Sequence, residues 1–227
     1  PVQGATVCIE VTAGTCAEAQ YTSTSAQDGT FSITADSGVT GVIRSSGGFD
    51  PITNRQFEDA ADSLSIGQPV TEQNFVISPL STMLNEYNGN VEYETLKSKL
   101  GIDSSFMIRF DNPYSNLDSA IYSKAAVVNT QLIILYDVVK KVHPNFENNS
   151  AMYELTEDIL NRTGSETSLG DTSFIKDFFT NLDSGFSPSS QQLVDLSSGT
   201  SAFLQKIYAD SSNSLAYFAN VGAVELA

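Results

Sequence analysis

Residues 76–84, VISPLSTML, mark the point at which the sequence changes from strand patterns to helical patterns. A serine followed by proline is typical of a helix start, because serine can cap the first turn and proline has no N–H to lose there. The apolar residues that follow recur at the three- and four-residue spacing of one helical face. We therefore expect an α+β chain, with a β module over residues 1–77 and a helical module over residues 78–227.

Upstream of this point, apolar and β-branched residues occur in short runs separated by turn signals such as Gln27-Asp28-Gly29. Alternation of apolar and polar residues predicts strands with one buried face. Turns that recur about every 8–12 residues are typical of a small β-sandwich. The candidate strands are residues 5–11, 21–25, 30–33, 42–44 and 69–77.

Downstream, the helical spacing continues almost to the end of the chain. His143-Pro144 ends the longest expected helix, because a residue that precedes proline disfavours helical backbone. Residues 221–226 return to a strand-like pattern and are a candidate C-terminal strand. The expected helices are residues 79–87, 91–100, 116–142, 149–161, 171–182 and 188–210.

The two cysteines, Cys8 and Cys16, flank the segment IEVTAGT, whose residues 12–14 have the composition of a hairpin tip. Strand residues placed symmetrically about such a tip face each other within the Cα separation that a disulfide allows. We expect a Cys8–Cys16 disulfide and hence an oxidising compartment; two buried free thiols are the alternative. Two thiols and the lone His143 make an incomplete metal-ligand set.

The charge of the chain excludes several classes of partner. With 27 acidic residues against 11 basic ones, the net charge is -16, which repels nucleic acid and anionic membrane surfaces. We find no run of about 20 apolar residues, so no membrane span is expected. An acidic, lysine-poor composition rich in Ser, Thr and Asn is common in secreted bacterial proteins. The first residue, Pro1, leads us to expect a processed or excised chain.

The sequence contains few of the patterns that carry catalysis. It has one histidine and no Gly-x-Ser-x-Gly elbow, phosphate-binding glycine loop or dinucleotide fingerprint. We therefore expect a non-enzymatic protein. A hydrolase with paired carboxylates stays an open alternative, because such pairs form in space rather than along the chain.

Calcium is the one cofactor that the acidic loops suggest, because Ca²⁺ prefers clusters of oxygen ligands. The alternative is that these carboxylates are solvated surface groups. The candidate ligands are Glu58, Asp59 and Asp62, with Asp103, Asp111 and Asp118 as a second group.

Several motifs together resemble a known family. They are PVQGATVC at residues 1–8, Cys16, QDGTFSI at 27–33, Gly47-Gly48, ISPLSTM at 77–83 and LGI at 100–102. This set is similar to carboxypeptidase-regulatory-like and related Ig-like modules of large bacterial surface proteins, over about residues 1–110. The resemblance implies an N-terminal Ig-like (transthyretin-like) β-sandwich and a secreted part without catalytic residues.

The leading functional hypothesis is a secreted bacterial structural protein, a cell-surface or extracellular filament subunit that self-associates through strand or edge contacts. Val221, Val224 and Leu226 of the candidate C-terminal strand are the expected assembly residues. The alternative is an adhesin-type module that binds a glycan or a peptide, with calcium as its cofactor. The third hypothesis is that the protein is an enzyme.

Overall fold

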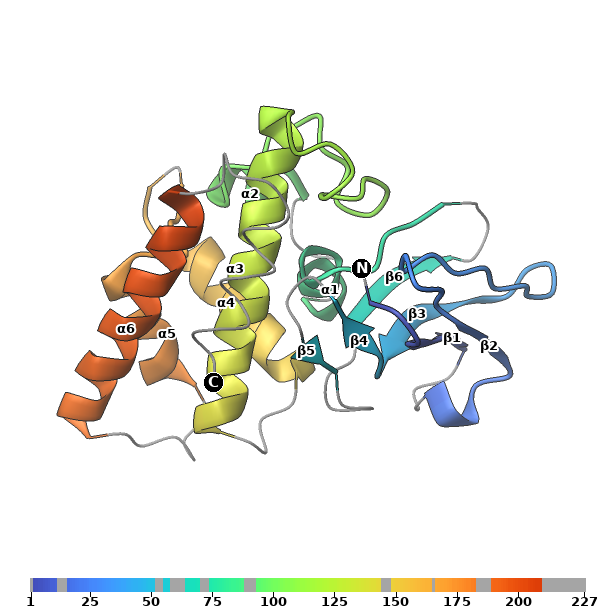
Figure 1. The fold of residues 1–227 in the computed structure, drawn as a ribbon, viewed down its shortest axis with the longest axis horizontal. Helices are drawn as coiled ribbons and strands as arrows, with labels where there is room; N and C mark the ends of the chain where they lie inside the picture. The colour runs from blue at the N-terminus through green and yellow to red at the C-terminus, as the bar shows by residue number, and fades with distance from the viewer. Residues whose placement is uncertain are drawn as a thin grey trace.

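The structure of the protein, a computed structural model, describes residues 2–11, 16–51, 55–57, 64–69, 74–87, 93–143, 148–164, 166–182 and 189–209. The chain is α+β, with the strands first and the helices after them (Figure 1). The strands are β1 (Thr6–Glu10), β2 (Tyr21–Thr24), β3 (Thr40–Ser46), β4 (Phe49–Asp50), β5 (Arg55–Gln56) and β6 (Leu64–Pro69). The helices are η1 (Cys16–Glu18), α1 (Pro79–Glu86), α2 (Tyr93–Lys99), α3 (Ala120–Val142), α4 (Asn148–Asn161), α5 (Thr172–Asn181) and α6 (Ser190–Ala209), of which η1 is a 3₁₀ turn.

Four strands form one antiparallel sheet in the order β2-β1-β3-β6, and β4 pairs with β5 in a separate ribbon. Val7, Ile9 and Ile43 are buried on one face of the sheet. The side chains of residues 8, 10 and 44 lie on the opposite face, because successive strand residues alternate and Cys8 pairs with Arg44.

The described residues do not show the expected β-sandwich; they form the four-stranded sheet and the separate β4–β5 ribbon. The predicted strand at residues 30–33 has no strand pairing, and neither do residues 74–77, the described end of the predicted strand 69–77. Their apolar side chains nevertheless pack against the sheet, and the rings of Phe31 and Phe75 meet at a tilt, with 5.8 Å between their centroids. The alternation of apolar residues therefore indicated which side chains pack against the sheet, but not whether the backbone of these residues forms hydrogen bonds with a neighbouring strand.

The helix predictions are confirmed, with ends within a few residues of the expected ones. Ser78 caps α1 through a hydrogen bond from Ser81 N–H, and the Ser81 side chain accepts from Ser78 N–H in return. Helix α3 begins later than expected, because Asn112 and Ser115 use their side chains to close turns before it.

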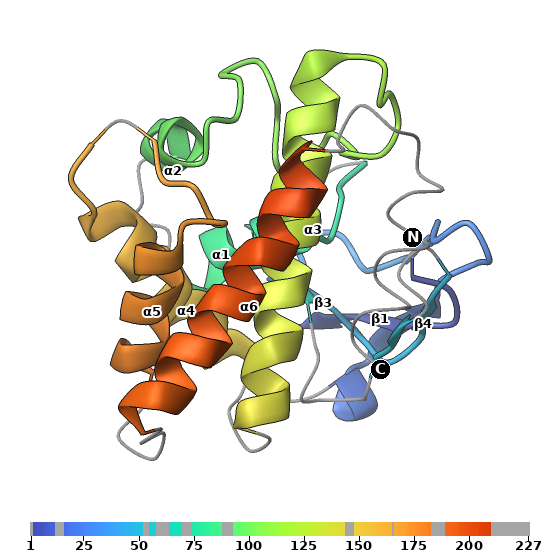
Figure 2. The same ribbon diagram turned by 60° about the vertical axis from the view of Figure 1, so that its left-hand side comes forward.

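Helix α3 is the centre of the helical core, with α6 crossing it in Figure 2 and α1 and α4 also in contact. Every residue from 125 to 136 is buried, so the helix is covered on all sides rather than along one stripe. Its polar residues find partners: Asn129 donates to the Tyr114 hydroxyl and accepts from Leu80 N–H, while Gln131 donates to Leu204 O. The core therefore tolerates these amides.

Candidate functional site

The two edges of the four-stranded sheet, β2 and β6, differ in how their backbone groups are satisfied. At the β6 edge, Ser65 N–H donates to Thr82 Oγ1 at 2.9 Å and Ser65 O accepts from Ser81 Oγ at 3.0 Å. Both hydroxyls belong to α1. Helix α1 therefore takes the place of a further strand at this point of the edge.

The register explains why Ser65 faces the helix. In an antiparallel sheet, the backbone N–H and C=O groups of successive residues point alternately to the strand on one side and to the strand on the other. Ser65 lies between Leu64 and Ile66, which pair with Ser45 and Ile43 of β3. Pro69, also on the outward side of this alternation, has no N–H to offer, which further limits pairing at β6.

The β2 edge is open within the described residues. Ser25, which directly follows β2, donates its N–H to Ala5 O at 2.9 Å. The backbone groups of the odd-numbered residues of β2 therefore face β1, and those of the even-numbered residues point away from the sheet. Those outward residues are Thr22 and Thr24, and both are exposed. Their N–H and C=O groups are available to an added strand.

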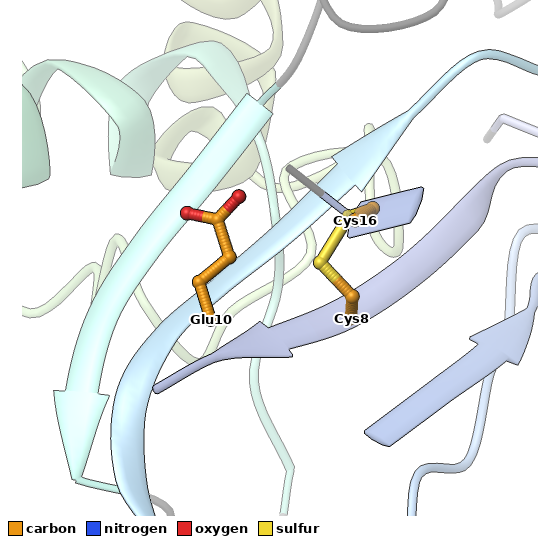
Figure 3. A group of neighbouring side chains, drawn as sticks. All are labelled: Cys8, Glu10 and Cys16. Carbon is orange, nitrogen blue, oxygen red and sulfur yellow. A yellow bond between two sulfur atoms is a disulfide. The ribbon is translucent and has the colours of Figure 1, made fainter. Parts of the chain in front are cut away.

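The Cys8–Cys16 disulfide is present in the structure, with 5.3 Å between the two Cα atoms. Figure 3 shows it joining β1 to η1, with Glu10 further along the same strand. The expected hairpin geometry was wrong, because Cys16 lies in a 3₁₀ turn and the residues opposite Cys8 are Thr22 and Arg44. The bridge thus fixes η1 over one face of the sheet.

Glu10 shares this buried site with the disulfide. Its Oε2 pairs with Arg44 Nε at 3.0 Å, and its side chain is only 7% exposed. Its Oε1 is buried and has no hydrogen-bond partner within the described part of the chain. The pattern Cys-x-Glu on a strand, which places both side chains on one face, is the signal that could have revealed Glu10 from the sequence.

Within the described residues, Cys8, Glu10 and Cys16 are the group of potential metal ligands that the fold brings together, with ligand atoms within 4.8 Å of one another. Sulfur atoms in a disulfide are not metal ligands in that state, because metals bind the thiolate.

Gly41 allows β3 to lie close to β1 beside Glu10, since a Cβ on Gly41 would lie 2.3 Å from the backbone O of Glu10.

Asp103, Asp111 and Asp118, the second group of calcium candidates, do not lie together as a set of ligands among the described residues. Asp103 Oδ1 accepts from the N–H and hydroxyl of Ser105, and these bonds hold the pKa of Asp103 below its ordinary value. Asp111 Oδ2 accepts from Met107 N–H at 2.8 Å. Each carboxylate thus closes its own turn, and Asp118 does not join them in a cluster of ligands among the described residues.

The other predicted site residues lie outside the described residues. They are the calcium candidates Glu58, Asp59 and Asp62 and the assembly candidates Val221, Val224 and Leu226.

A shallow hollow of about 560 Å³ lies at the end of β2. Its lining is uncharged and includes three glutamine side chains and one aromatic ring. The amide of Gln56 is already engaged, because it donates to Gly48 O and Phe57 O. The lining residues are Gln3, Gly4, Ser25, Ala26, Gln27, Gly48, Phe49 and Gln56.

Comparison with known protein families, curated proteins and solved structures finds no match for this chain. In the part of the chain that the structure describes, no helix has both the length and the apolar character needed to cross a membrane.

Proposed function

We propose that this chain is a non-enzymatic structural protein of the bacterial cell surface or of an extracellular filament, whose copies assemble by strand addition at β2. The observation that carries the proposal is the difference between the two sheet edges. Helix α1 covers β6 at Ser65, whereas Thr22 and Thr24 keep outward backbone groups without partners among the described residues. An added strand would satisfy these groups.

The proposed occupant is the C-terminal segment of a second copy, residues 221–226, with Val221, Val224 and Leu226 as its apolar residues. Residues 210–227 follow α6, and in extended form they reach roughly 60 Å. A tail of one copy on the β2 edge of the next is a head-to-tail contact, which leaves both ends of the assembly open and so produces filaments.

Charge supports the choice of this surface. At a net charge of -16, copies repel one another, so association is favoured where carboxylates are few. Strand β2, with the sequence YTST, has no charged side chain. Residues 221–227 contain a single acidic side chain, Glu225. The two proposed partners therefore meet with little mutual repulsion.

The disulfide and the family resemblance support the same class of protein. A Cys8–Cys16 bridge is stable in the oxidising environment outside the cell. The motifs over residues 1–110 resemble modules of bacterial extracellular proteins. Both are consistent with secretion to the cell surface.

A proline scan along β2 tests the proposal. Thr22→Pro removes an outward N–H and should leave a folded monomer that no longer forms filaments, seen by negative-stain electron microscopy and sedimentation at moderate salt. Ser23→Pro is the matched control, because its N–H points toward β1, so this variant should lose fold stability instead. Filaments of unchanged length from Thr22→Pro would reject the β2 edge as the contact.

A mixing experiment tests the occupant. Deletion of residues 221–227 should leave the β2 edge free, and Thr22→Pro should leave the tail free, so each variant alone stays monomeric. Mixed in equal amounts, they should form one-to-one pairs that grow no further. Filaments from the deletion variant alone, or the absence of pairs in the mixture, would rule out the C-terminal tail.

The uncharged hollow beside β2 favours a second candidate function, an adhesin-type module for a neutral glycan or a peptide. This candidate predicts a ligand-dependent rise in Tm on screening glycans and peptides, lost in Gln27→Ala. Repeating the screen with calcium and with a chelator tests the calcium dependence assigned to Glu58, Asp59 and Asp62. A monomer that binds nothing in either condition would remove the candidate.

A further inference from the structure

The side chains of Cys8, Cys16 and Glu10 converge on one buried point of the sheet, and this convergence goes beyond what a disulfide needs. We infer that, once the disulfide is reduced, these three side chains form a binding site for a thiophilic divalent cation, with Zn²⁺ as its representative. The site is independent of the assembly proposed above, which uses the oxidised protein.

The geometry is close to that of a zinc centre. The ligand atoms of the three residues lie within 4.8 Å of one another. In a tetrahedral site with Zn–S bonds of about 2.3 Å, ligand atoms are separated by about 3.8 Å. When the S–S bond breaks, the sulfur atoms can separate to this spacing, and the distance from the carboxylate oxygen to the sulfur atoms needs to shorten by about 1 Å or less. Two thiolates and one carboxylate leave a fourth position for water.

The carboxylate of Glu10 also points to a bound cation, because its Oε1 is buried and accepts no hydrogen bond from the residues that the structure describes. A buried carboxylate oxygen without a donor is rare and carries a desolvation cost. The other oxygen, Oε2, is held by Arg44, which fixes the carboxylate, and a carboxylate oxygen of Glu10 lies within 4.8 Å of both sulfur atoms. A cation at this point would give Oε1 the partner that it lacks.

The charge of the site is compatible with both states. In the oxidised state, the charges of Glu10 and Arg44 cancel. In the reduced, metal-bound state, two thiolates and Glu10 are balanced by Zn²⁺ and Arg44. Exchanging the disulfide for the metal therefore adds no net charge to a buried site, which would otherwise be costly.

The chemical step requires a reductant, for which a phosphine is used in the test. The phosphine and one water convert the disulfide into two thiols and become a phosphine oxide. Binding of Zn²⁺ then releases two protons, because the metal binds the thiolates. With a dithiol in place of the phosphine, the two electrons come from the dithiol, which closes its own disulfide.

The test is a competition between the full-length protein and a chromophoric zinc chelator, without oxygen and with the phosphine present or absent. Reduced protein should bind one Zn²⁺ per chain, and oxidised protein should bind at least about a hundredfold more weakly. Glu10→Gln should lower the affinity of reduced protein by more than about tenfold, a cost seen even for groups that only support a ligand. Equal binding by oxidised and reduced protein would overturn the proposal.

Glu18→Gln is the matched control, because Glu18 lies exposed in η1, two residues after Cys16. The reduced Glu18→Gln variant should bind zinc as tightly as the reduced wild type. An equal decrease in zinc affinity in Glu10→Gln and Glu18→Gln would reject Glu10 as the ligand. Cd²⁺ in place of Zn²⁺ should give the ultraviolet absorption of a thiolate–metal bond in reduced wild type and not in Cys8→Ser.

Circular dichroism of the same samples covers the case in which reduction unfolds the sheet. If the reduced apo protein loses strand signal, Zn²⁺ should restore it, because metal binding is then coupled to folding. Strand signal that stays lost in the presence of Zn²⁺ would overturn the inference. Zinc binding and filament formation are measured in different redox states, so either proposal can fail without the other.

Discussion

Thr82 Oγ1 accepts a hydrogen bond from the backbone N–H of Ser65 at 2.9 Å, so a helix side chain closes the edge of a sheet. The same hydroxyl donates to Ser78 O in the first turn of α1. This contact joins the β part of the chain to the helical part, although their buried apolar residues form two separate clusters. The predicted β module and helical module are therefore in contact through hydrogen bonds at this point.

Thr82→Val should destabilise the fold, because valine keeps the volume but leaves the buried Ser65 N–H without an acceptor. The expected loss is about 1–3 kcal/mol in the free energy of unfolding, measured by urea denaturation. Thr180→Val is the control, since Thr180 lies exposed on α5 and its hydroxyl donates to Lys176 O of the same helix. A loss that is the same in both variants would mean that the Ser65 contact contributes nothing of its own.

Asp171 caps α5 by accepting from Ser173 N–H at 2.7 Å. Asp171→Ala should cost about 1 kcal/mol of stability at pH 7. Hydrogen bonds from the Ser173 side chain and backbone hold the pKa of Asp171 below its ordinary 3.8. A lowered pKa stabilises the fold above 3.8, and this contribution disappears as the pH falls through the folded pKa.

The advantage of wild type over Asp171→Asn should therefore decrease in acid. Chemical denaturation of both proteins between neutral pH and pH 2 measures it. A difference that stays constant across this range would show that the charge of Asp171 plays no part in the cap.

Asp158 should show the opposite dependence on pH. Burial raises the pKa of Asp158 above its ordinary 3.8, and its Oδ2 has no hydrogen-bond partner among the residues described by the structure. A raised pKa of an acid means that the folded state binds the proton more tightly, so stability is gained as the pH falls through the folded pKa. Relative to Asp158→Asn, wild type should gain stability on acidification and stop gaining below pH 3.8. The measurement is the same denaturation series, and a loss in acid would contradict it.

Removal of the disulfide should lower stability by about 2–3 kcal/mol, because the bridge closes a short loop in the unfolded chain. The double variant Cys8→Ser/Cys16→Ser, compared with oxidised wild type by thermal and urea unfolding, measures this difference. A variant as stable as wild type would show that η1 is held over the sheet by its other contacts alone.

The helices were predictable because their signals are local. The Ser78-Pro79 start lies in the first turn of α1, and His143-Pro144 lies directly after the last residue of α3. The strands were harder to predict. Residues 64–69 form the edge strand β6 although their sequence has no clear alternation, whereas residues 30–33 alternate and do not pair. Strand pairing depends on distant partners, which no local pattern contains.

By itself, the sequence determined the α+β order, the approximate positions of the helices and the acidic charge, because each follows from neighbouring residues or from composition. It also predicted the Cys8–Cys16 disulfide, but not the 3₁₀ turn in which Cys16 lies. Only the tertiary structure decided which sheet edge is open and what shares the site of the disulfide. Thr82 meets Ser65 from 17 residues away, and Arg44 reaches Glu10 across two paired strands. Such contacts depend on register and packing, where a shift of one residue would turn every side chain of the strand to the opposite face.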